Sequence, residues 1–281
     1  IVNADITTLV GDLNIEADID GSLDTSDALE IGTNISISSA GDLKLDATTG
    51  KILGSDGLNL VANETVLLND NLVISGSLRI ESGADDNGTG DFTLLSGTSI
   101  DTQGNTLEIR SNDIDLGGSL VASELSLFIS DSGDIGIGDY DLDLTKDYVL
   151  SKDEIQRITA DVLNVGGETA GDIYVKEISE ANRATITDLV RIESTGEAGK
   201  VIFEGSTSST FNALEATASD GIEVNVDLYS LIGSLTLEGD SDGTEDTNDN
   251  VEIASSTTLI SARDVNIDAT NGGIVVNDDL T

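Results

Sequence analysis

The sequence lacks five residue types: its 281 residues include no cysteine, histidine, methionine, tryptophan or proline. Without histidine and cysteine, the usual general base, the thiolate nucleophile and the common zinc ligands are missing, which excludes Ser-His-Asp and Cys-His catalysis. Oxygen ligands remain, and these favour calcium or magnesium. Because proline has no amide hydrogen for a sheet ladder, its absence is typical of a backbone that is paired between strands almost throughout.

Positive charge is also scarce, with 12 Lys and Arg against 54 Asp and Glu, a net charge of -42. Such a chain repels nucleic acid and anionic membrane surfaces, so we expect no nucleic-acid partner. No apolar run approaches the roughly 18 residues of a membrane span, so we expect no membrane insertion either. Although acidic chains with few aromatic residues are often disordered, 38% of these residues are hydrophobic. Their regular spacing predicts a folded chain.

Residues 1–58 and 223–280 are two copies of one sequence. At an offset of 222 they align without a gap, and 25 of the 58 positions are identical. This predicts one complete repeat at 1–222 and the start of a second copy at 223–281. Since the sequence starts at Ile1 and has no methionine, we expect it to be a window of a longer tandem array. A repeat of this length favours an extended structural protein over a self-contained enzyme.

A short phrase recurs along the chain: a small or acidic residue, then an apolar, a polar and an apolar residue, as in Asp12-Leu-Asn-Ile15 and Asp42-Leu-Lys-Leu45. This alternation, bounded by Gly, Asn, Asp and Ser, is the signal of short strands. Many short strands at close spacing predict an all-β chain folded as a right-handed parallel β-helix (β-solenoid). At roughly 20 to 28 residues per coil, the chain would form about 10 to 14 coils with one aliphatic core. The following side chains are predicted to point inward: Ile15, Ile31, Leu45, Leu60, Ile80, Ile109, Leu127, Val175, Leu237, Ile253 and Ile267.

Residues 146–200 differ from the rest, since they hold 7 of the 12 basic residues and have a net charge of only -4. Residues 151–158 are predicted to form one short helix, because Ser151 and Glu154 have the spacing of a capping box and Leu150 and Ile155 that of a hydrophobic staple. The segment is either a decorated turn of a coil or a lateral contact point for an acidic neighbour.

Two phrases of this segment carry a resemblance: Leu150-Ser-Lys-Asp-Glu-Ile-Gln-Arg-Ile-Thr-Ala160-Asp-Val-Leu-Asn-Val165-Gly166 and Ala170-Gly-Asp-Ile-Tyr-Val175. Two later phrases are similar, Leu235-Thr-Leu-Glu-Gly-Asp-Ser-Asp-Gly243 and Val265-Asn-Ile-Asp-Ala-Thr-Asn-Gly-Gly273. They resemble the repeats of filamentous-haemagglutinin-like giant bacterial β-helix exoproteins, which are surface-associated β-strand-repeat adhesins. The resemblance implies export, an extracellular or cell-surface location, a parallel β-helix and an adhesive or scaffolding role. It carries over no catalytic residues.

Acidic loops in the two copies are the candidate metal sites. Carboxylates two residues apart and interrupted by glycine can converge on one hard cation, although the glycines do not fit the EF-hand pattern. Calcium and solvated turns are both open interpretations of these loops and of a similar one at 85–91. The candidate calcium ligands are Asp18, Asp20, Asp24 and Asp27 in the first copy and Asp240, Asp242, Asp246 and Asp249 in the second.

The function predicted from these features is a non-catalytic structural segment of an extracellular fibre, sheath or adhesin built from tandem β-helix repeats. We expect end-to-end or lateral self-association, with cell-surface glycans or matrix as further partners. The alternative is a surface-layer or tandem β-sandwich calcium-dependent adhesin, which would need recurring domains of about 100 residues. A β-helix enzyme acting on polysaccharides is the third interpretation; carboxylates abound, but only four Tyr and four Phe could provide sugar platforms.

Overall fold

The computed structural model describes residues 1–17, 28–48, 50–140, 145–196, 198–244 and 248–277. In these residues the chain is nearly all β, with 31 short strands and two helices of four residues each. Every strand pair whose register is defined among them is parallel. The chain divides into two compact units: Ile1–Asp131 with Arg157–Ala160, and Ser132–Gln156 with Asp161–Thr281. The predicted all-β class with parallel strands is confirmed, and the arrangement is solenoid-like.

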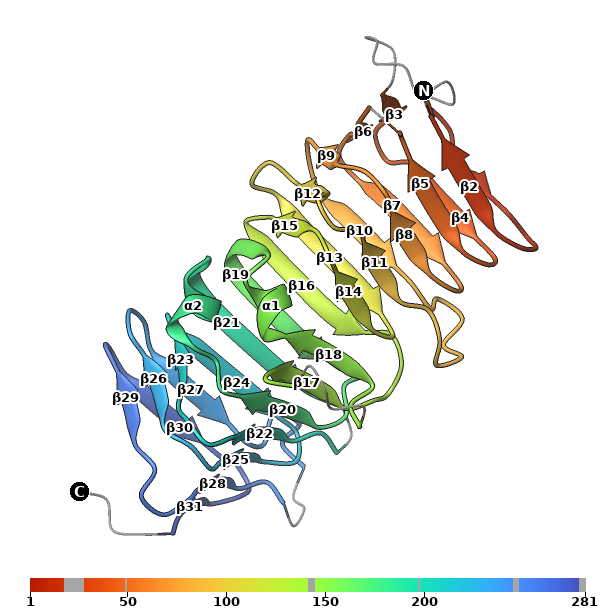
Figure 1. The fold of residues 1–281 in the computed structure, drawn as a ribbon. Helices are drawn as coiled ribbons and strands as arrows, with labels where there is room; N and C mark the ends of the chain where they lie inside the picture. The colour runs from red at the N-terminus through yellow and green to blue at the C-terminus, as the bar shows by residue number, and fades with distance from the viewer. Residues whose placement is uncertain (18–27, 49, 141–144, 197, 245–247, 278–281) are drawn as a thin grey trace. The chain divides into compact units, whose positions relative to one another are not determined.

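In the first unit, successive strands visit three ladders of parallel strands in a fixed order (Figure 1). The first ladder contains β1 (Ile6–Thr7), β4 (Ser36–Ser39), β7 (Leu58–Ala62), β10 (Leu78–Glu81), β13 (Thr106–Ser111) and β16 (Glu124–Ile129). The second contains β2 (Leu13–Glu16), β5 (Leu43–Asp46), β8 (Val66–Leu68), β11 (Phe92–Leu94) and β14 (Ile114–Leu116). The third contains β3 (Leu29–Ile31), β6 (Ile52–Gly54), β9 (Leu72–Ile74), β12 (Ser99–Asp101) and β15 (Ser119–Val121).

Stacked side chains of one kind make the core of this unit. In β10, Ile80 lies between Leu60 of β7 and Ile109 of β13, and all three are fully buried. Because successive side chains of a strand point to opposite faces, such a register puts every second residue on the equivalent residue of the next strand. The apolar-polar-apolar phrase is therefore the local cause of a continuous aliphatic interior.

The second unit has a similar order from β22 onward. One ladder contains β17 (Ile135–Gly138), β18 (Tyr148–Ser151), β20 (Ile173–Lys176), β22 (Val201–Glu204), β25 (Ile222–Val224), β28 (Val251–Ile253) and β31 (Ile274–Val276). Another contains β23 (Ser209–Phe211), β26 (Leu228–Ser230) and β29 (Leu259–Ser261). The last runs from the part of β19 (Ile158–Gly167) that follows Ala160 through β21 (Ile186–Ser194), β24 (Leu214–Ala218) and β27 (Leu235–Glu238) to β30 (Val265–Asp268). One step is reversed, since β18 pairs with β17 on the side away from β20.

The two helices take the place of strands. The helix α2 (Glu180–Arg183) lies between β20 and β21 in the chain, where the next coil has β23, and it contacts both β23 and α1 (Lys152–Ile155). The predicted helix at 151–158 exists, with Ser151 as its N-cap and both bonds of the capping box, but its predicted end is wrong. It ends at Ile155, because Ile158 already pairs with Leu120 as the first residue of β19. The second helix was not predicted.

Nine of the eleven predicted core residues are buried. The exceptions are Ile15 and Ile267, which are only half-buried. Each lies on the outermost strand of its ladder in the described residues, β2 and β30, so a neighbouring strand covers it on one side alone. The predicted inward direction of Ile15 is still visible in the alternating exposure of β2.

The two sequence copies have the same strands at an offset of 222. The bounds of β2, β3, β5 and β6 recur in β27, β28, β30 and β31. Their registers recur as well, since Leu13 pairs with Leu43 as Leu235 pairs with Val265. The steps between stacked residues, 30 in this pair and 23 between Leu29 and Ile52, are therefore equal in both copies.

Candidate functional site

Five of the eight predicted calcium ligands, Asp18, Asp20, Asp24, Asp27 and Asp246, lie outside the described residues. The other three follow or precede strands of the second unit. Asp240 is 2% exposed: its Oδ1 accepts a hydrogen bond from the Gly243 N–H at 3.0 Å and its Oδ2 one from the Asn271 N–H at 2.5 Å. The carboxylate of Asp242 accepts hydrogen bonds from the N–H and hydroxyl of Thr244, at 2.8 and 2.9 Å.

These bonds give Asp240 and Asp242 structural roles in their turn. Asp240 joins its own turn to the turn one coil further on, and the Asn271 side chain returns a bond to the Gly243 carbonyl at 2.8 Å. Asp249 is 1% exposed in the same region. Among the described residues, no three acidic side chains come close enough to share a metal ion. Calcium binding by the complete loops stays a prediction.

The similar loop at 85–91 is also held together by its own side chains. Asn87 Oδ1 accepts a hydrogen bond from the Thr89 N–H at 3.0 Å, and Asn87 Nδ2 donates to Asp85 at 3.1 Å. The Thr89 hydroxyl donates to Glu64 Oε2 at 3.0 Å, which fastens the loop to the preceding coil. The polar groups of this loop therefore form an ordered turn.

Carboxylates at the starts of strands form a recurring device that the sequence analysis missed. Asp12 Oδ1 accepts the N–H of Asp42 at 3.0 Å, and Asp42 Oδ1 accepts the N–H of Thr65 at 3.0 Å. In the second unit, Asp134 and Asp172 accept the N–H groups of Asp172 and Lys200 in the same way. Each carboxylate thus continues the hydrogen-bond ladder beyond the strand end, toward the next strand of the ladder. The signal was present as the acidic residue that opens the recurring phrase.

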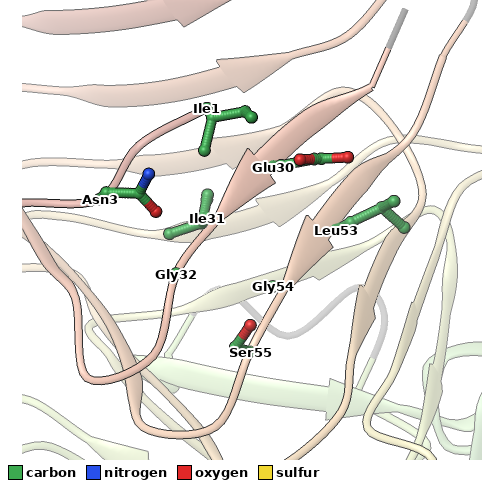
Figure 2. Close-up of a pocket in the computed structure, with 8 residues that line it drawn as sticks. All are labelled: Ile1, Asn3, Glu30, Ile31, Gly32, Leu53, Gly54 and Ser55. Carbon is green, nitrogen blue, oxygen red and sulfur yellow. The ribbon is translucent and has the colours of Figure 1, made fainter. Parts of the chain in front are cut away.

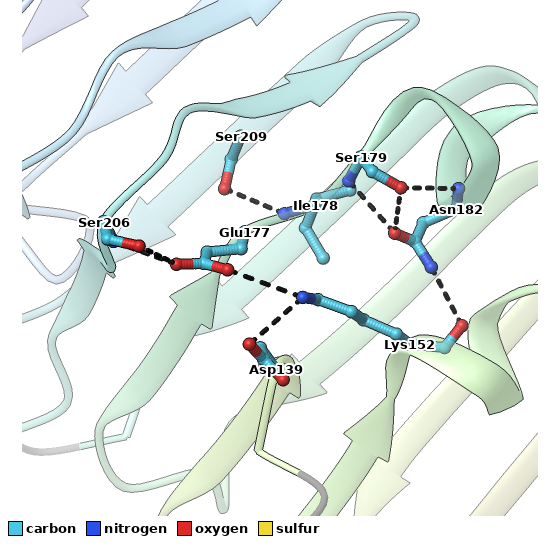
Figure 3. Close-up of polar contacts among 8 residues, drawn as sticks. All are labelled: Asp139, Lys152, Glu177, Ile178, Ser179, Asn182, Ser206 and Ser209. Atoms are coloured by element: carbon cyan, nitrogen blue, oxygen red, sulfur yellow. Dashed lines mark hydrogen bonds and ion pairs between the residues drawn. The ribbon is translucent and has the colours of Figure 1, made fainter.

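A polar cluster joins segments of the second unit that are distant in sequence (Figure 3). Lys152 of α1 lies between Asp139, at 3.1 Å, and Glu177, at 3.5 Å. Glu177 adopts a left-handed backbone with φ of 57°, and its Oε1 accepts hydrogen bonds from the N–H and hydroxyl of Ser206, at 2.9 and 2.7 Å. The bonds from Ser206 and the nearby Lys152 ammonium lower the pKa of Glu177 to about 2. Glu177 is therefore a fixed anion at neutral pH and no proton donor.

The helix α2 completes this cluster. Its N-cap Ser179 and Asn182 form a reciprocal capping box, and Asn182 Nδ2 donates to the Lys152 carbonyl at 2.9 Å (Figure 3). Asn182 is 1% exposed, so its amide bridges the two helices inside the protein. A sequence signal existed: Ser151 and Ile158 recur 28 residues later as Ser179 and Ile186.

The less acidic segment at 146–200 uses its basic groups internally. Lys200 pairs with Glu223 at 3.0 Å and Arg191 with Glu215 at 3.0 Å, both across neighbouring strands. Lys146 lies 3.1 Å from the centre of the Tyr174 ring and 3.5 Å from Asp134. Because these basic side chains already pair within the protein, they contribute less positive charge to a contact with an acidic neighbour.

A shallow groove lies beside β3 and β6 in the first unit and has a volume of about 290 Å³ (Figure 2). Its lining residues are Ile1, Asn3, Glu30, Ile31, Gly32, Leu53, Gly54 and Ser55. Glu30 is the only ionisable side chain in this lining. Most glycoside hydrolases use a pair of carboxylates, and this lining has one.

In the second sequence copy, Val276 occupies the position equivalent to Gly54, so a larger side chain stands where the groove has glycine. Neither helix in the described part of the chain has the length needed to cross a membrane. No protein-family model, curated protein or solved structure matches the chain.

Proposed function

We propose that this chain is a non-catalytic structural segment of an extracellular fibre, sheath or adhesin, folded as a right-handed parallel β-helix. The observation that carries the proposal is the fixed visiting order of three ladders of parallel strands. A chain that stacks coils in this way grows in one direction and buries one continuous core. Length, rather than a chemical site, is then the property that the sequence encodes.

The number of coils follows from the strand order. The strands β1 to β15 form five successive triplets, and β22 to β30 form three more. The helices α1 and α2 stand in two further coils, in place of one strand each. Leaving out β16, β17 and β31, the described strands thus support about ten coils, which lies within the predicted range.

The repeat of 222 residues supports a tandem array. Residues 1–222 are one repeat and 223–281 open the next, in a continuous β-helix rather than in separate domains. The equal coil steps of both copies support this assignment, because a continuing array needs the same register at each recurrence. End-to-end continuity of this kind, together with lateral contacts, makes a filament.

Location and partners follow from the resemblance to filamentous-haemagglutinin-like exoproteins. We place the protein at the cell surface, with cell-surface glycans or matrix as partners, and with no role in nucleic-acid binding, membrane insertion or catalysis. A net charge of -42 supports the exclusion of polyanions. The alternative of tandem β-sandwiches is disfavoured by the parallel registers of the strands, because sandwich sheets of that class are antiparallel.

Extending the array tests the proposal. Residues 59–280 inserted after residue 280 add one repeat in register, because 223–280 replaces 1–58 as the preceding segment. Small-angle scattering should show a rod that lengthens by roughly 40 to 50 Å per inserted copy, at about 4.8 Å per coil. A control insert shortened by about ten residues, less than half a coil, should not stack in register and should bend or fray the rod. Compact particles whose length does not grow with copy number would refute the proposal.

A further inference from the structure

An exposed apolar pair occupies the same turn in both copies of the repeat. In the first copy it is Leu9 and Val10, which are 87% and 89% exposed. In the second it is Leu231 and Ile232, which are 45% and 54% exposed although coils lie on both sides of them. We call these two pairs, with their flanking residues Thr8–Gly11 and Ser230–Gly233, the apolar turns.

Hydrogen bonds keep the apolar pairs at the tips of these turns. The Thr8 hydroxyl donates to the Gly11 carbonyl at 3.2 Å, and the equivalent Ser230 hydroxyl donates to the Gly233 carbonyl at 2.9 Å. A hydroxyl from the next coil donates to the same carbonyls, from Ser39 in the first copy and Ser261 in the second. Since both ends of the turn are fixed, the two apolar side chains between them cannot fold back into the core.

A third exposed apolar residue lies near the second apolar turn. Ile260 of β29 is 49% exposed and pairs in register with Tyr229 of β26, two residues before Leu231. The tyrosine hydroxyl donates to Asp227 at 3.0 Å, so a carboxylate lies at the margin of this surface. An apolar surface with a polar margin is typical of a protein contact.

We propose that the apolar turns are the lateral contacts between parallel copies of this chain. Recurrence points to this occupant: a second chain with the same 222-residue repeat can meet an apolar turn at every repeat. A partner without that period could meet only isolated turns. Contacts that are weak singly then add along the array, because each contact made brings the next into reach. This inference rests on the proposed structural function.

The negative charge of the chain predicts how salt should change the strength of this contact. Two chains of net charge -42 repel each other, and salt screens this repulsion over a Debye length of about 10 Å at 0.1 M. An apolar contact therefore strengthens as sodium chloride rises. A contact through the basic groups of 146–200 would consist of ion pairs and would weaken instead.

Sedimentation velocity tests the inference over a concentration series at about 0.02, 0.15 and 0.5 M sodium chloride. The chain should self-associate, more strongly at higher salt. The dissociation constant of the variant L9S/V10N/L231S/I232N should be at least about 30-fold higher than that of the wild type, and that of each two-residue variant about 10-fold higher. Leu95→Ser is the matched control, since Leu95 is 41% exposed and lies outside the apolar turns. Circular dichroism checks that every variant is folded. We expect folding to be retained, because substitutions at exposed positions usually change stability little.

Three outcomes would overturn the inference. The wild-type chain could stay monomeric at all three salt concentrations, its association could weaken as salt rises, or the variant with all four substitutions could associate as the wild type does. None of them decides the proposed function, because the length of single rods carrying added repeats is measured separately and on dilute samples.

Discussion

Replacing Asn182 with alanine should loosen the corner at which α1, α2 and β23 meet. The Asn182 side chain makes three kinds of bond there while only 1% exposed: its Oδ1 accepts from the Ser179 N–H at 3.0 Å and from the Ser179 hydroxyl, and its Nδ2 donates to the Lys152 carbonyl at 2.9 Å. Alanine removes all of them at once and puts no other acceptor in their place.

The expected cost is the sum of the lost hydrogen bonds. Ser179 is exposed, so water can replace the acceptor that its N–H loses, and each such bond contributes about 0.5 to 1.5 kcal/mol. The Lys152 carbonyl loses less, because Gln156 also donates to it, from its N–H at 3.4 Å and from its side chain at 3.2 Å. Together these losses amount to about 2 kcal/mol, which is roughly a 30-fold change in a local opening equilibrium.

Hydrogen exchange followed by mass spectrometry is the suitable assay, since long stacked chains need not unfold in one step. Peptides covering 177–187 should exchange about 30-fold faster in the variant, while peptides covering β10 and β13 should keep the wild-type rates. Asn266→Ala is the control: this asparagine is exposed and makes one bond of 3.3 Å, to Thr236. Unchanged exchange at 177–187, or a uniform increase throughout the chain, would refute the assignment of Asn182 as the bridge between the helices.

Three further predictions concern the core, the carboxylates and the loops. Leu45→Ala should lower the free energy of unfolding by about 2 to 5 kcal/mol. Ile15→Ala, on the strand that pairs with it, should lower this free energy clearly less, because Ile15 is only half-buried. Urea titrations compare the two variants, and equal losses would contradict the lower burial of core residues at β2. The pKa of Glu177 is lowered from 4.5 to about 2, so its contribution to stability is present above about pH 4.5 and is lost as pH falls toward 2. Glu177→Gln should therefore make stability depend less on pH in this window. A curve identical to that of the wild type would contradict a stabilising contact between Glu177 and Ser206. Millimolar calcium should raise the melting temperature more than sodium chloride of equal ionic strength if the acidic loops bind it; equal effects would indicate screening alone.

The core was predictable because its signal is local. Each phrase such as Asp42-Leu-Lys-Leu45 states which side chains point inward, and in a parallel ladder the inward residues of one strand meet those of the next. No long-range information is needed for Leu43 and Leu45 to be buried. The same rule overestimates the burial of Ile15 and Ile267, because burial also depends on whether a neighbouring strand covers each side of the residue.

The corner of the second unit was less predictable because its structure depends on partners distant in sequence. The capping box at Ser151 was recognised, but Ser179 has Asn182 where that pattern has Glu154, and an asparagine three residues after a serine is a weaker signal. The bond from Asn182 to Lys152, 30 residues away, adds to the capping box of α2 and has no local signal. The reversed step from β17 to β18 has no local signal either, since the phrase around Tyr148 resembles every other strand.

Part of the acidity of the chain has a structural role in its turns. The chain must turn between strands of different ladders, and at each turn the N–H groups just before the next strand would lose their partners. An aspartate one coil below provides an oxygen at the required place, as Asp12 does for Asp42 and Asp56 does for Ser77. The Ser77 N–H and hydroxyl in turn hold the pKa of Asp56 below its usual value, so that this carboxylate stays charged. Repeating the device along a stack produces columns of like charge, as with Asp134 and Asp172, and their mutual repulsion is the cost of satisfying the turns. Screening by salt reduces that repulsion without removing the bonds, so a chain built in this way should be most stable in saline surroundings.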